Sequence, residues 1–361
     1  MESQPTVLVT GATGFLGAWI IKKALESNKY KVRGSMRNHK DEKRLKSLRD
    51  AFGDDFNRLE LVSADLTDDD AISKAVEGCD YVLHVASPFP AVSPKDEMEV
   101  IRPAVAGNES ILNACDKHNV KRVVITSSCS TIDDFSRGKI ELNEEYFCEP
   151  KSYTTPYIKS KIAAEKRAWE LIDEINDKPE RKNNKLEMTM LLPSVIAGPL
   201  LLKEMGATAT FFSEVLSGTS SGFVPYYARV IDVRDCAEGH LKALETEPFK
   251  RYAMIAEHMY IGEAGKWIEE EFTQFGYKPV TKVNSAFVLW LGSWFNKDAD
   301  YYYGAANVEM SINTDKTKED LQIDYISMKK SYIDMCYSFI NLGMVEAKGD
   351  VKDKMPDYLK A

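Results

Sequence analysis

The amino-acid sequence predicts an α/β protein, with a Rossmann-type doubly wound parallel sheet and a smaller C-terminal α/β lobe. Two observations carry this prediction. A glycine-rich turn stands between the first apolar run and the first helical pattern, and short β-branched runs then alternate with helical patterns over residues 1–192. Strands that alternate with helices form parallel sheets with right-handed crossovers. At 361 residues the chain is long enough to bury a core in both parts.

The first unit is a strand, a glycine turn and a helix, in the order that dinucleotide binding requires. Thr6–Thr10 is a short apolar, β-branched run, and residues 18–25 have helical periodicity. Gly11 allows a tight turn, Gly14 lets the backbone approach a pyrophosphate, and Gly17 lets the helix pack against the strand. The alternative is a plain glycine-rich connection between a strand and a helix.

The second strand, predicted over residues 30–37, bears on the choice of dinucleotide. Proteins that hold the ribose of NAD carry an acid at this strand end, about 20 residues after the glycines. The strand instead ends at Arg37, and Lys43 and Arg44 follow. Guanidinium groups bind phosphate in a bidentate manner, so the sequence favours NADP(H) over NAD(H). The alternative is a solvated basic start to the next helix, where acidic neighbours dilute the charge.

The next two strands add candidate contacts at the same edge of the sheet. Residues 59–66 include Asp65, which is placed to accept a hydrogen bond from an adenine amino group; the alternative is that it caps the helix from Asp68. Residues 80–86 form a fourth strand, followed by a proline-containing loop in the region where open parallel sheets bind ligands. His84 lies inside this apolar strand, so we interpret it as a core histidine rather than a base.

Ser128 ends the fifth strand, predicted over residues 121–130, in a cluster of hydroxyl side chains. Helices are predicted before and after it, over residues 96–118 and 157–175. A sixth strand follows over residues 186–192. Because parallel strands end at one edge of a sheet, we expect Ser128 to lie on the same edge as the glycine turn.

Tyr157 and Lys161 stand four residues apart at the start of a predicted helix and therefore share one helix face. A nearby ammonium lowers the pKa of a phenol from about 10, and such a phenol can give a proton to a carbonyl oxygen near neutral pH. A Ser128 hydroxyl converging on the same oxygen would polarise the carbonyl for hydride attack. Tyr325 and Lys329 match the same spacing, but no hydroxyl-rich strand precedes them, so packing is the better interpretation.

These motifs together resemble those of the extended short-chain dehydrogenases/reductases, in the NAD-dependent epimerase/dehydratase superfamily. Within it the chain is similar to the dihydroflavonol-reductase-like group, which contains plant dihydroflavonol and cinnamoyl-CoA reductases and yeast methylglyoxal/isovaleraldehyde reductases. Besides the glycine turn and the Tyr-Lys pair, the resemblance rests on residues 32–37, 84–89, 126–128, 193–199 and 227–235.

The resemblance implies an NADPH-dependent carbonyl reductase that acts on an aldehyde or ketone, or the reverse alcohol oxidation. It implies that Tyr157 is the general acid, that Lys161 binds the nicotinamide ribose, and that Ser128 hydrogen-bonds the substrate carbonyl. The residues that it assigns to NADP(H) are Gly11, Thr13, Gly14, Phe15, Leu16, Gly17, Arg37, Arg44, Asp65, Leu66, Val85, Ala86, Ser87, Thr126, Tyr157, Lys161, Pro193, Ser194 and Ile196. The residues expected at a substrate pocket are Phe89, Asp133, Phe212 and Tyr226.

Two departures from the group narrow the expected substrate. Cinnamoyl-CoA reductases carry an Asn-Trp-Tyr-Cys-Tyr-type motif before the lysine, whereas this chain has Tyr-Thr-Thr-Pro-Tyr at residues 153–157. CoA thioesters are therefore not expected as substrates. Residues 133–152 also lack a clear dihydroflavonol-reductase pattern.

Two other functions stay open on the same scaffold. A nucleotide-sugar epimerase or dehydratase would retain NAD⁺, usually with an acid at the end of the second strand, and Arg37 argues against it. A non-catalytic NADP(H) sensor would tend to lose the catalytic tyrosine or lysine, and this chain keeps both.

Composition narrows the partners that the sequence predicts. The net charge of −9 argues against nucleic acid, and the longest apolar stretch, residues 286–295, is too short to span a bilayer. Six scattered cysteines and a start without a signal-like run are typical of a reduced, cytoplasmic protein. The five histidines show no ligand spacing, so no metal is expected. We expect a small-molecule substrate, no membrane or nucleic-acid partner, and a monomer or homodimer.

The domain division follows from the loss of regular strand–helix alternation after Pro193. We expect residues 1–192 to form mainly the NADP(H)-binding domain, with residues 229–261 returning to it. Residues 193–228 and 262–345 then form the substrate lobe, whose aromatic side chains either wall an apolar pocket or fill the core of the lobe. Residues 346–361 are predicted to be a polar tail, disordered in part.

Overall fold

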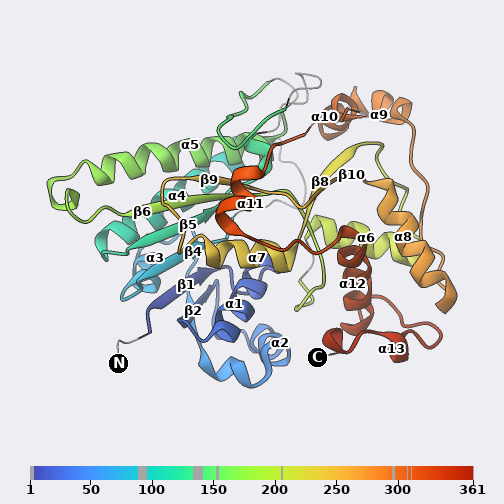
Figure 1. The fold of residues 1–361 in the computed structure, drawn as a ribbon, viewed down its shortest axis with the longest axis horizontal. Coiled ribbons are helices and arrows are strands. Elements are labelled where there is room, and N and C mark those ends of the chain that lie inside the picture. Colours follow the sequence, from blue (N-terminus) through green and yellow to red (C-terminus); the bar gives the residue numbers. More distant parts are fainter. Residues whose placement is uncertain are drawn as a thin grey trace.

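A seven-stranded sheet is the central element of the fold (Figure 1). The structure is a computed structural model that describes residues 4–87, 96–132, 141–151, 154–204, 206–294, 297–306, 308–309 and 311–360. The strand order is β3-β2-β1-β4-β5-β6-β9, and every neighbouring pair is parallel. The doubly wound parallel sheet predicted from the sequence is therefore confirmed.

The strands are short and most of them are apolar at their centres. Their bounds are β1 (Thr6–Thr10), β2 (Lys31–Met36), β3 (Leu59–Ser63), β4 (Tyr81–His84), β5 (Arg122–Thr126), β6 (Glu187–Pro193) and β9 (Arg251–Met254). The chain reverses its direction of travel across the sheet between β1 and β4. In open sheets of this type the ligand crevice lies at that switch point, beyond the carboxyl ends of the strands.

Helices cover both faces of the sheet (Figure 1). One face is covered by α1 (Phe15–Ser27), α2 (Glu42–Phe52) and α7 (Val233–Lys242), and the other by α3 (Asp69–Val76), α4 (Met98–Lys117) and α5 (Pro156–Asn176). Successive strand residues point to opposite faces, so Val7 and Val9 join the first apolar cluster while Leu8 joins the second. Double coverage explains why β1 is apolar at consecutive positions.

A second sheet of three strands, in the order β10-β8-β7, forms the core of the smaller lobe. Its strands are β7 (Val195–Ala197), β8 (Tyr227–Asp232) and β10 (Glu257–Tyr260). The helices of the C-terminal part are α6 (Ala207–Ser217), α8 (Gly262–Phe272), α9 (Ala286–Ser293), α10 (Lys297–Ala305), α11 (Asp315–Leu321), α12 (Met328–Asn341) and α13 (Val351–Lys354).

Residues 229–261, which we expected to return to the large domain, are divided between the two sheets. Helix α7 packs against α1, and β9 extends the large sheet beside β6. Strands β8 and β10 pair with each other in the small sheet instead. The chain therefore crosses between the lobes several times, which ties them together.

The C-terminal residues were predicted to be a partly disordered tail, and this prediction is wrong for the described part. Val351, Met355 and Leu359 are 0%, 3% and 9% exposed and belong to the apolar core of the smaller lobe. These three side chains recur every four residues inside a strongly charged segment. Their burial stabilises the segment, although the charges dominate its average composition.

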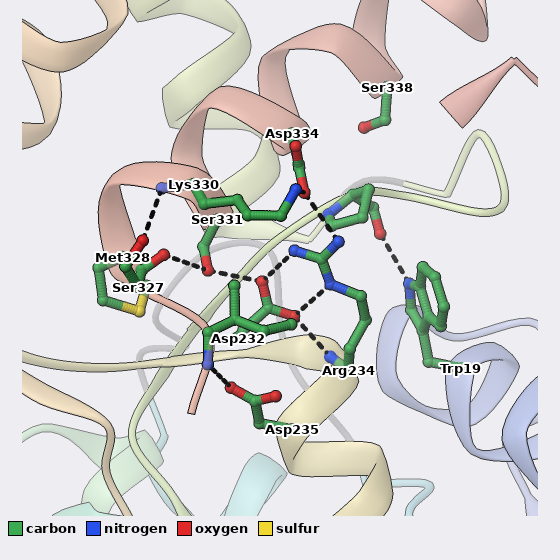
Figure 2. A network of polar contacts seen from close by, with 12 residues as sticks. Trp19, Asp232, Arg234, Asp235, Ser327, Met328, Lys330, Ser331, Asp334 and Ser338 are labelled. Atoms are coloured by element: carbon green, nitrogen blue, oxygen red, sulfur yellow. Dashed lines mark hydrogen bonds and ion pairs between the residues drawn. The ribbon is translucent and has the colours of Figure 1, made fainter. Parts of the chain in front are cut away.

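A polar network joins α7 to α12 where the two lobes meet (Figure 2). Asp232 is fully buried and accepts hydrogen bonds from the Arg234 guanidinium at 2.7 and 2.8 Å and from Ser331 Oγ at 2.5 Å. Arg234 also donates to Asp334 at 2.7 Å. Each buried charge thus has an opposite charge beside it, which a buried ion requires.

Asp235, the next carboxyl in this region, is expected to make stability depend on pH. Burial raises the pKa of Asp235 to about 7, whereas the pKa of an aspartate in the unfolded chain is about 3.9. The native protein therefore holds a proton that the unfolded chain has lost, and stability falls as pH rises from about 4 to about 7. Asp235→Asn keeps an acceptor for the Ile326 amide, 2.8 Å away. We expect it to stabilise the protein by up to about 4 kcal/mol at pH 8 and little at pH 4.

Chemical denaturation at the two pH values checks this expectation. Asp232→Asn is the matched control, because it leaves the Arg234 guanidinium buried without its main partner and should destabilise the protein at both pH values. A loss of stability in Asp235→Asn that is equal at both pH values would contradict the raised pKa.

Two further structural observations concern membranes and metals. Within the described ranges, no helix combines the length and the apolar character that a membrane span needs. The His, Cys, Asp and Glu side chains of the same residues form no group of three or more that is suited to a metal ion. The six cysteines are buried free thiols.

Candidate active site

The glycine turn between β1 and α1 is shaped by backbone contacts that leave no room for side chains. Gly11 has φ +75°, in the left-handed region that favours glycine. A Cβ on Gly17 would lie 2.2 Å from the Gly11 carbonyl oxygen, so the helix packs against the turn only because Gly17 has no side chain. Helix α1 begins at Phe15, three residues earlier than predicted, because Gly14 already acts as its N-cap.

The start of α1 fits an anionic group such as a pyrophosphate. Gly14 is exposed, and among the described residues no side chain caps this helix end. The first amide groups of a helix lack intrahelical partners and carry a partial positive charge. The turn is thus a cradle that Cβ atoms would fill, and it presents backbone donors as dinucleotide binding requires. Thr13 and Leu16 flank the cradle; Leu16 is buried and Thr13 is partly exposed.

Cationic side chains lie beyond the end of β2, as predicted. Arg37 is exposed, and its charge contributes to a lowered pKa of Asp65, after the larger effect of hydrogen bonds from Thr67. Arg44 Nη1 lies 3.5 Å from Thr13 Oγ1, next to the glycine turn. Arg44 also pairs with Asp41 and Glu204 at 3.6 and 3.4 Å. Asp65 does not cap α3, because Asp68 does so by accepting from the Ala71 amide.

The end of β4 is attached to the glycine turn by the Thr10 hydroxyl. Its Oγ1 accepts from the backbone amides of Val85 and Ala86, both at 3.0 Å, and lies 3.0 Å from His84 Nδ1. Burial lowers the pKa of His84 to about 3, so the ring is neutral. Its interpretation as a core histidine is confirmed by its exposure of only 3%. Ser87, which follows Ala86, accepts a hydrogen bond from Lys161 Nζ at 3.0 Å.

Ser128 and Tyr157 meet at the carboxyl end of β5. Ser128 is in extended conformation, and its Oγ accepts from the Ser130 amide at 3.2 Å. Tyr157 is the second residue of α5, which starts at Pro156 and is capped by the Thr155 hydroxyl. The Ser128 hydroxyl lowers the pKa of the Tyr157 phenol, so the two hydroxyl groups lie near each other. The structure thus brings together the two side chains that the sequence predicted to converge.

The protonation state of Tyr157 differs from the expectation drawn from the sequence. Burial raises the pKa of the phenol above its usual value of 10, and the neighbouring Ser128 hydroxyl opposes this only partly. Lys161 Nζ lies 5.9 Å from the centre of the Tyr157 ring and donates a hydrogen bond to Ser87 Oγ. The tyrosine is therefore a neutral phenol at neutral pH, a state that is able to donate a proton.

Lys161 is buried at the inner face of α5 beside a small cavity. Burial lowers its pKa to about 8, and the neighbouring Glu165 carboxylate opposes this effect. The cavity has a volume of about 10 Å³, near the space that one water molecule needs. Asn108 and Glu165 line it together with Lys161. The sequence analysis predicted a role for neither Asn108 nor Glu165. The signal for Glu165 was a charged residue four positions after Lys161, on a helix face that is otherwise apolar.

The remaining predicted cofactor residues lie near the same edge with different roles for their side chains. Thr126 Oγ1 lies 2.8 Å from His240 Nε2, so its hydroxyl is engaged with α7. Ser194 donates from both its amide and its hydroxyl to the Met254 carbonyl, at 3.1 and 3.0 Å. Phe15 packs against the apolar clusters of both lobes. Pro193 is buried, while Leu66 and Ile196 are partly exposed.

The four residues predicted at a substrate pocket do not form one pocket in the described part of the structure. Phe89 and Asp133 lie outside the described residues. Phe212 is only 2% exposed, and its ring centre lies 4.5 Å from that of Tyr332. It fills the core of the smaller lobe rather than a pocket wall, because its helix packs directly on α12. Tyr226 is partly exposed, and its ring lies 5.5 Å from that of Tyr302.

The fold and this arrangement define a dinucleotide-binding α/β protein with a serine, a tyrosine and a lysine gathered beside the glycine turn. The chain belongs to the NAD dependent epimerase/dehydratase family, whose model matches residues 7–254. The resemblance to this superfamily inferred from the sequence is therefore confirmed.

Several relatives within the family are reductases. Cinnamoyl-CoA reductase 1 of Petunia hybrida is 31% identical over 281 residues, 76% of this chain and 79% of that protein. Tetraketide alpha-pyrone reductase 1 of Arabidopsis thaliana is 34% identical over 255 residues, 68% of this chain and 74% of that protein. Among solved structures, yeast methylglyoxal/isovaleraldehyde reductase complexed with NADPH is 25% identical with a TM-score of 0.74, over 94% of this chain and 99% of that one.

Proposed function

We propose that this chain is an NADPH-dependent reductase of an aldehyde or ketone, with Tyr157 as the general acid. The observation that carries the proposal is that Ser128, after β5, and Tyr157, at the start of α5, lie near each other, with Lys161 one helical turn along on the same face as Tyr157. The Lys161–Ser87 bond links this group to the loop after β4. The reductase names of the relatives support the same class of reaction.

Each residue of the candidate active site has its own role in the proposed reduction. NADPH, when bound, supplies a hydride to the carbonyl carbon. The Ser128 and Tyr157 hydroxyls donate hydrogen bonds to the carbonyl oxygen and stabilise the negative charge that develops on it. The Tyr157 proton then moves to that oxygen and completes the alcohol. The Lys161 ammonium holds its position through Ser87 and stabilises the phenolate that Tyr157 becomes.

Residues beyond the glycine turn support NADP(H) as the cofactor. Arg37 is exposed at the end of β2, where the 2′-phosphate of the adenosine ribose would lie and where NAD-specific proteins carry an acid. The start of α1 would hold the pyrophosphate, and Asp65 and Leu66 would frame the adenine. The NADPH complex of the yeast reductase supports the same choice.

Arg37→Ala is expected to raise the KM for NADPH by about 10- to 100-fold while leaving the KM for NADH nearly unchanged. A charge-assisted hydrogen bond to phosphate contributes about 1.5–3 kcal/mol, which corresponds to that range. Steady-state kinetics with both cofactors measure the ratio. Arg49→Ala, another exposed arginine, on α2, is the control and should change neither value. Equal effects of Arg37→Ala on NADPH and NADH would remove the case for a phosphate site.

A panel of carbonyl compounds tests the function itself. Consumption of NADPH should be measured with aldehydes, methyl ketones, α-dicarbonyls, dihydroflavonols and CoA thioesters. We expect turnover with members of the aldehyde and ketone classes and none with the thioesters, because residues 153–157 lack the motif of the CoA reductases. Tightly bound NAD⁺ in the purified protein would favour an epimerase or dehydratase. Tight NADPH binding without turnover on the whole panel would favour a sensor.

A further inference from the structure

A buried ion pair lies behind the candidate active site and takes no part in the proposed proton transfer. Glu165 on α5 and Arg251 on β9 are 1% and 8% exposed, and Arg251 Nε lies 2.6 Å from Glu165 Oε1. Removing two charges from water is costly, and apolar residues of similar size often stabilise a core at least as well. The hydrogen bonds that Glu165 and Arg251 make to other residues indicate a second role for the ion pair.

The Glu165 carboxylate reaches the strand end that carries Ser128. Its second oxygen, Oε2, accepts a hydrogen bond from the hydroxyl of Ser127. Ser127 directly precedes Ser128, and its amide donates to the Leu191 carbonyl at 2.7 Å. One side of Ser128 is thereby held by α5 through Glu165.

The Arg251 guanidinium holds the other side of Ser128. Its Nη2 donates to Thr131 Oγ1 at 3.0 Å, and the Thr131 hydroxyl donates to the Ser128 carbonyl at 2.9 Å. Arg251 also donates from Nη1 to the backbone carbonyls of Glu144 and Tyr146. The ion pair therefore holds the turn on both sides of Ser128. Through Arg251 it also anchors the part of the chain that leads from Ser128 towards Tyr157.

Glu165 belongs to the same face of α5 as the two other site residues. It follows Lys161 by four positions and Tyr157 by eight, and residues at this spacing lie along one side of a helix. Lys161 and Glu165 line the same small cavity. One face of α5 thus carries Tyr157, Lys161 and the carboxylate that binds the hydroxyl of Ser127, next to Ser128.

We infer that the Glu165–Arg251 pair positions Ser128 relative to Tyr157, so that both hydroxyls meet on one carbonyl oxygen. Both residues are positioning residues, since neither touches the reacting atoms. The inference rests on the proposed function, because it assigns the pair a role in that reaction. Displacement of a reacting group by about 1 Å can lower a rate by about 100-fold. The distance between α5 and the turn that carries Ser128 should therefore affect kcat directly.

Glu165→Gln tests the inference, with Ser127→Ala as a milder second variant. Ser127→Ala removes one arm of the network and leaves the ion pair intact. We expect kcat to fall by about 10- to 100-fold in Glu165→Gln and by a smaller factor in Ser127→Ala, with the KM for NADPH nearly unchanged in both. Because Glu165 raises the pKa of Lys161, the alkaline limb of the rate profile should also move to lower pH in Glu165→Gln.

Glu187→Gln is the matched control. Glu187 pairs with the buried Arg122 at 2.6 Å, at the opposite ends of β5 and β6 from the site. It should lower thermal stability without changing kcat per folded molecule or the pH profile. If Glu165→Gln behaves like this control, or if Ser127→Ala leaves kcat unchanged, the pair is merely structural and the inference fails. Absence of turnover in the wild-type protein would instead overturn the proposed function.

Discussion

Tyr157→Phe should lower turnover by about 10²- to 10⁴-fold while NADPH still binds. The substitution removes one oxygen atom and keeps the ring, so α5 and its packing should remain as they are. The missing hydroxyl is the one that lies near Ser128, and general acids contribute rate factors of this size. Steady-state kinetics measure the loss, and fluorescence titration with NADPH measures binding.

Tyr325→Phe is the matched control for this variant. Tyr325 stands in the second Tyr-x-x-x-Lys match and is partly buried, beside the apolar cluster of α1 and α7. Burial raises the pKa of its phenol to about 12, so this tyrosine is neutral as well. We expect its loss to leave turnover unchanged. A Tyr157→Phe enzyme with near wild-type turnover would refute the assignment of the acid.

Lys161→Met should lower kcat/KM by about 10²-fold or more and remove the alkaline limb of the rate profile. Burial lowers the pKa of Lys161 to about 8, so the wild-type ammonium loses its proton, and reduction slows, as pH rises through that value. The variant has no such group, and its rate should not fall there. Kinetics between about pH 6 and about pH 10 provide the comparison.

Stability separates this catalytic effect from unfolding. A lysine whose native pKa lies below its unfolded value destabilises the folded protein at neutral pH, and this cost disappears as pH rises past the unfolded pKa of about 10.4. Lys161→Met should therefore be no less stable than wild type at neutral pH. Lys159→Met, two residues away and paired with Glu97 at 2.6 Å, is the control and should keep full activity. A persistent alkaline limb near pH 8 in Lys161→Met would assign it to another group.

The fold was accessible from the sequence because its signals are local. The runs that became β1, β5 and β6 are apolar at consecutive positions, and the glycines between β1 and α1 allow close approaches of the backbone. Gly17 illustrates this, since its place against the Gly11 carbonyl admits no Cβ. The start of α5, predicted at Tyr157, likewise lies within one residue of the observed start at Pro156.

Three expectations failed where the deciding contact comes from a distant part of the chain. Phe212 was expected at a substrate pocket, but α12 covers it, more than a hundred residues later in the sequence. The charged C-terminal segment is held by three apolar side chains that only the finished lobe can bury. Tyr157 was expected to have a lowered pKa, but burial beneath the surrounding elements raises it instead.

By itself, the sequence determined the class of fold, the glycine turn, the cationic end of β2 and the three side chains of the candidate site. Each of these features depends on a few residue types that stand close together in the sequence. The regular backbone geometry of strands, turns and helices then fixes where their side chains lie. Only the tertiary structure decided that Ser128 lies near Tyr157, that Lys161 donates to Ser87 and that Glu165 and Arg251 lie behind them. These contacts join residues from separate strands and helices, so they exist only when the sheet has brought the carboxyl ends of β4 and β5 and the helix α5 together.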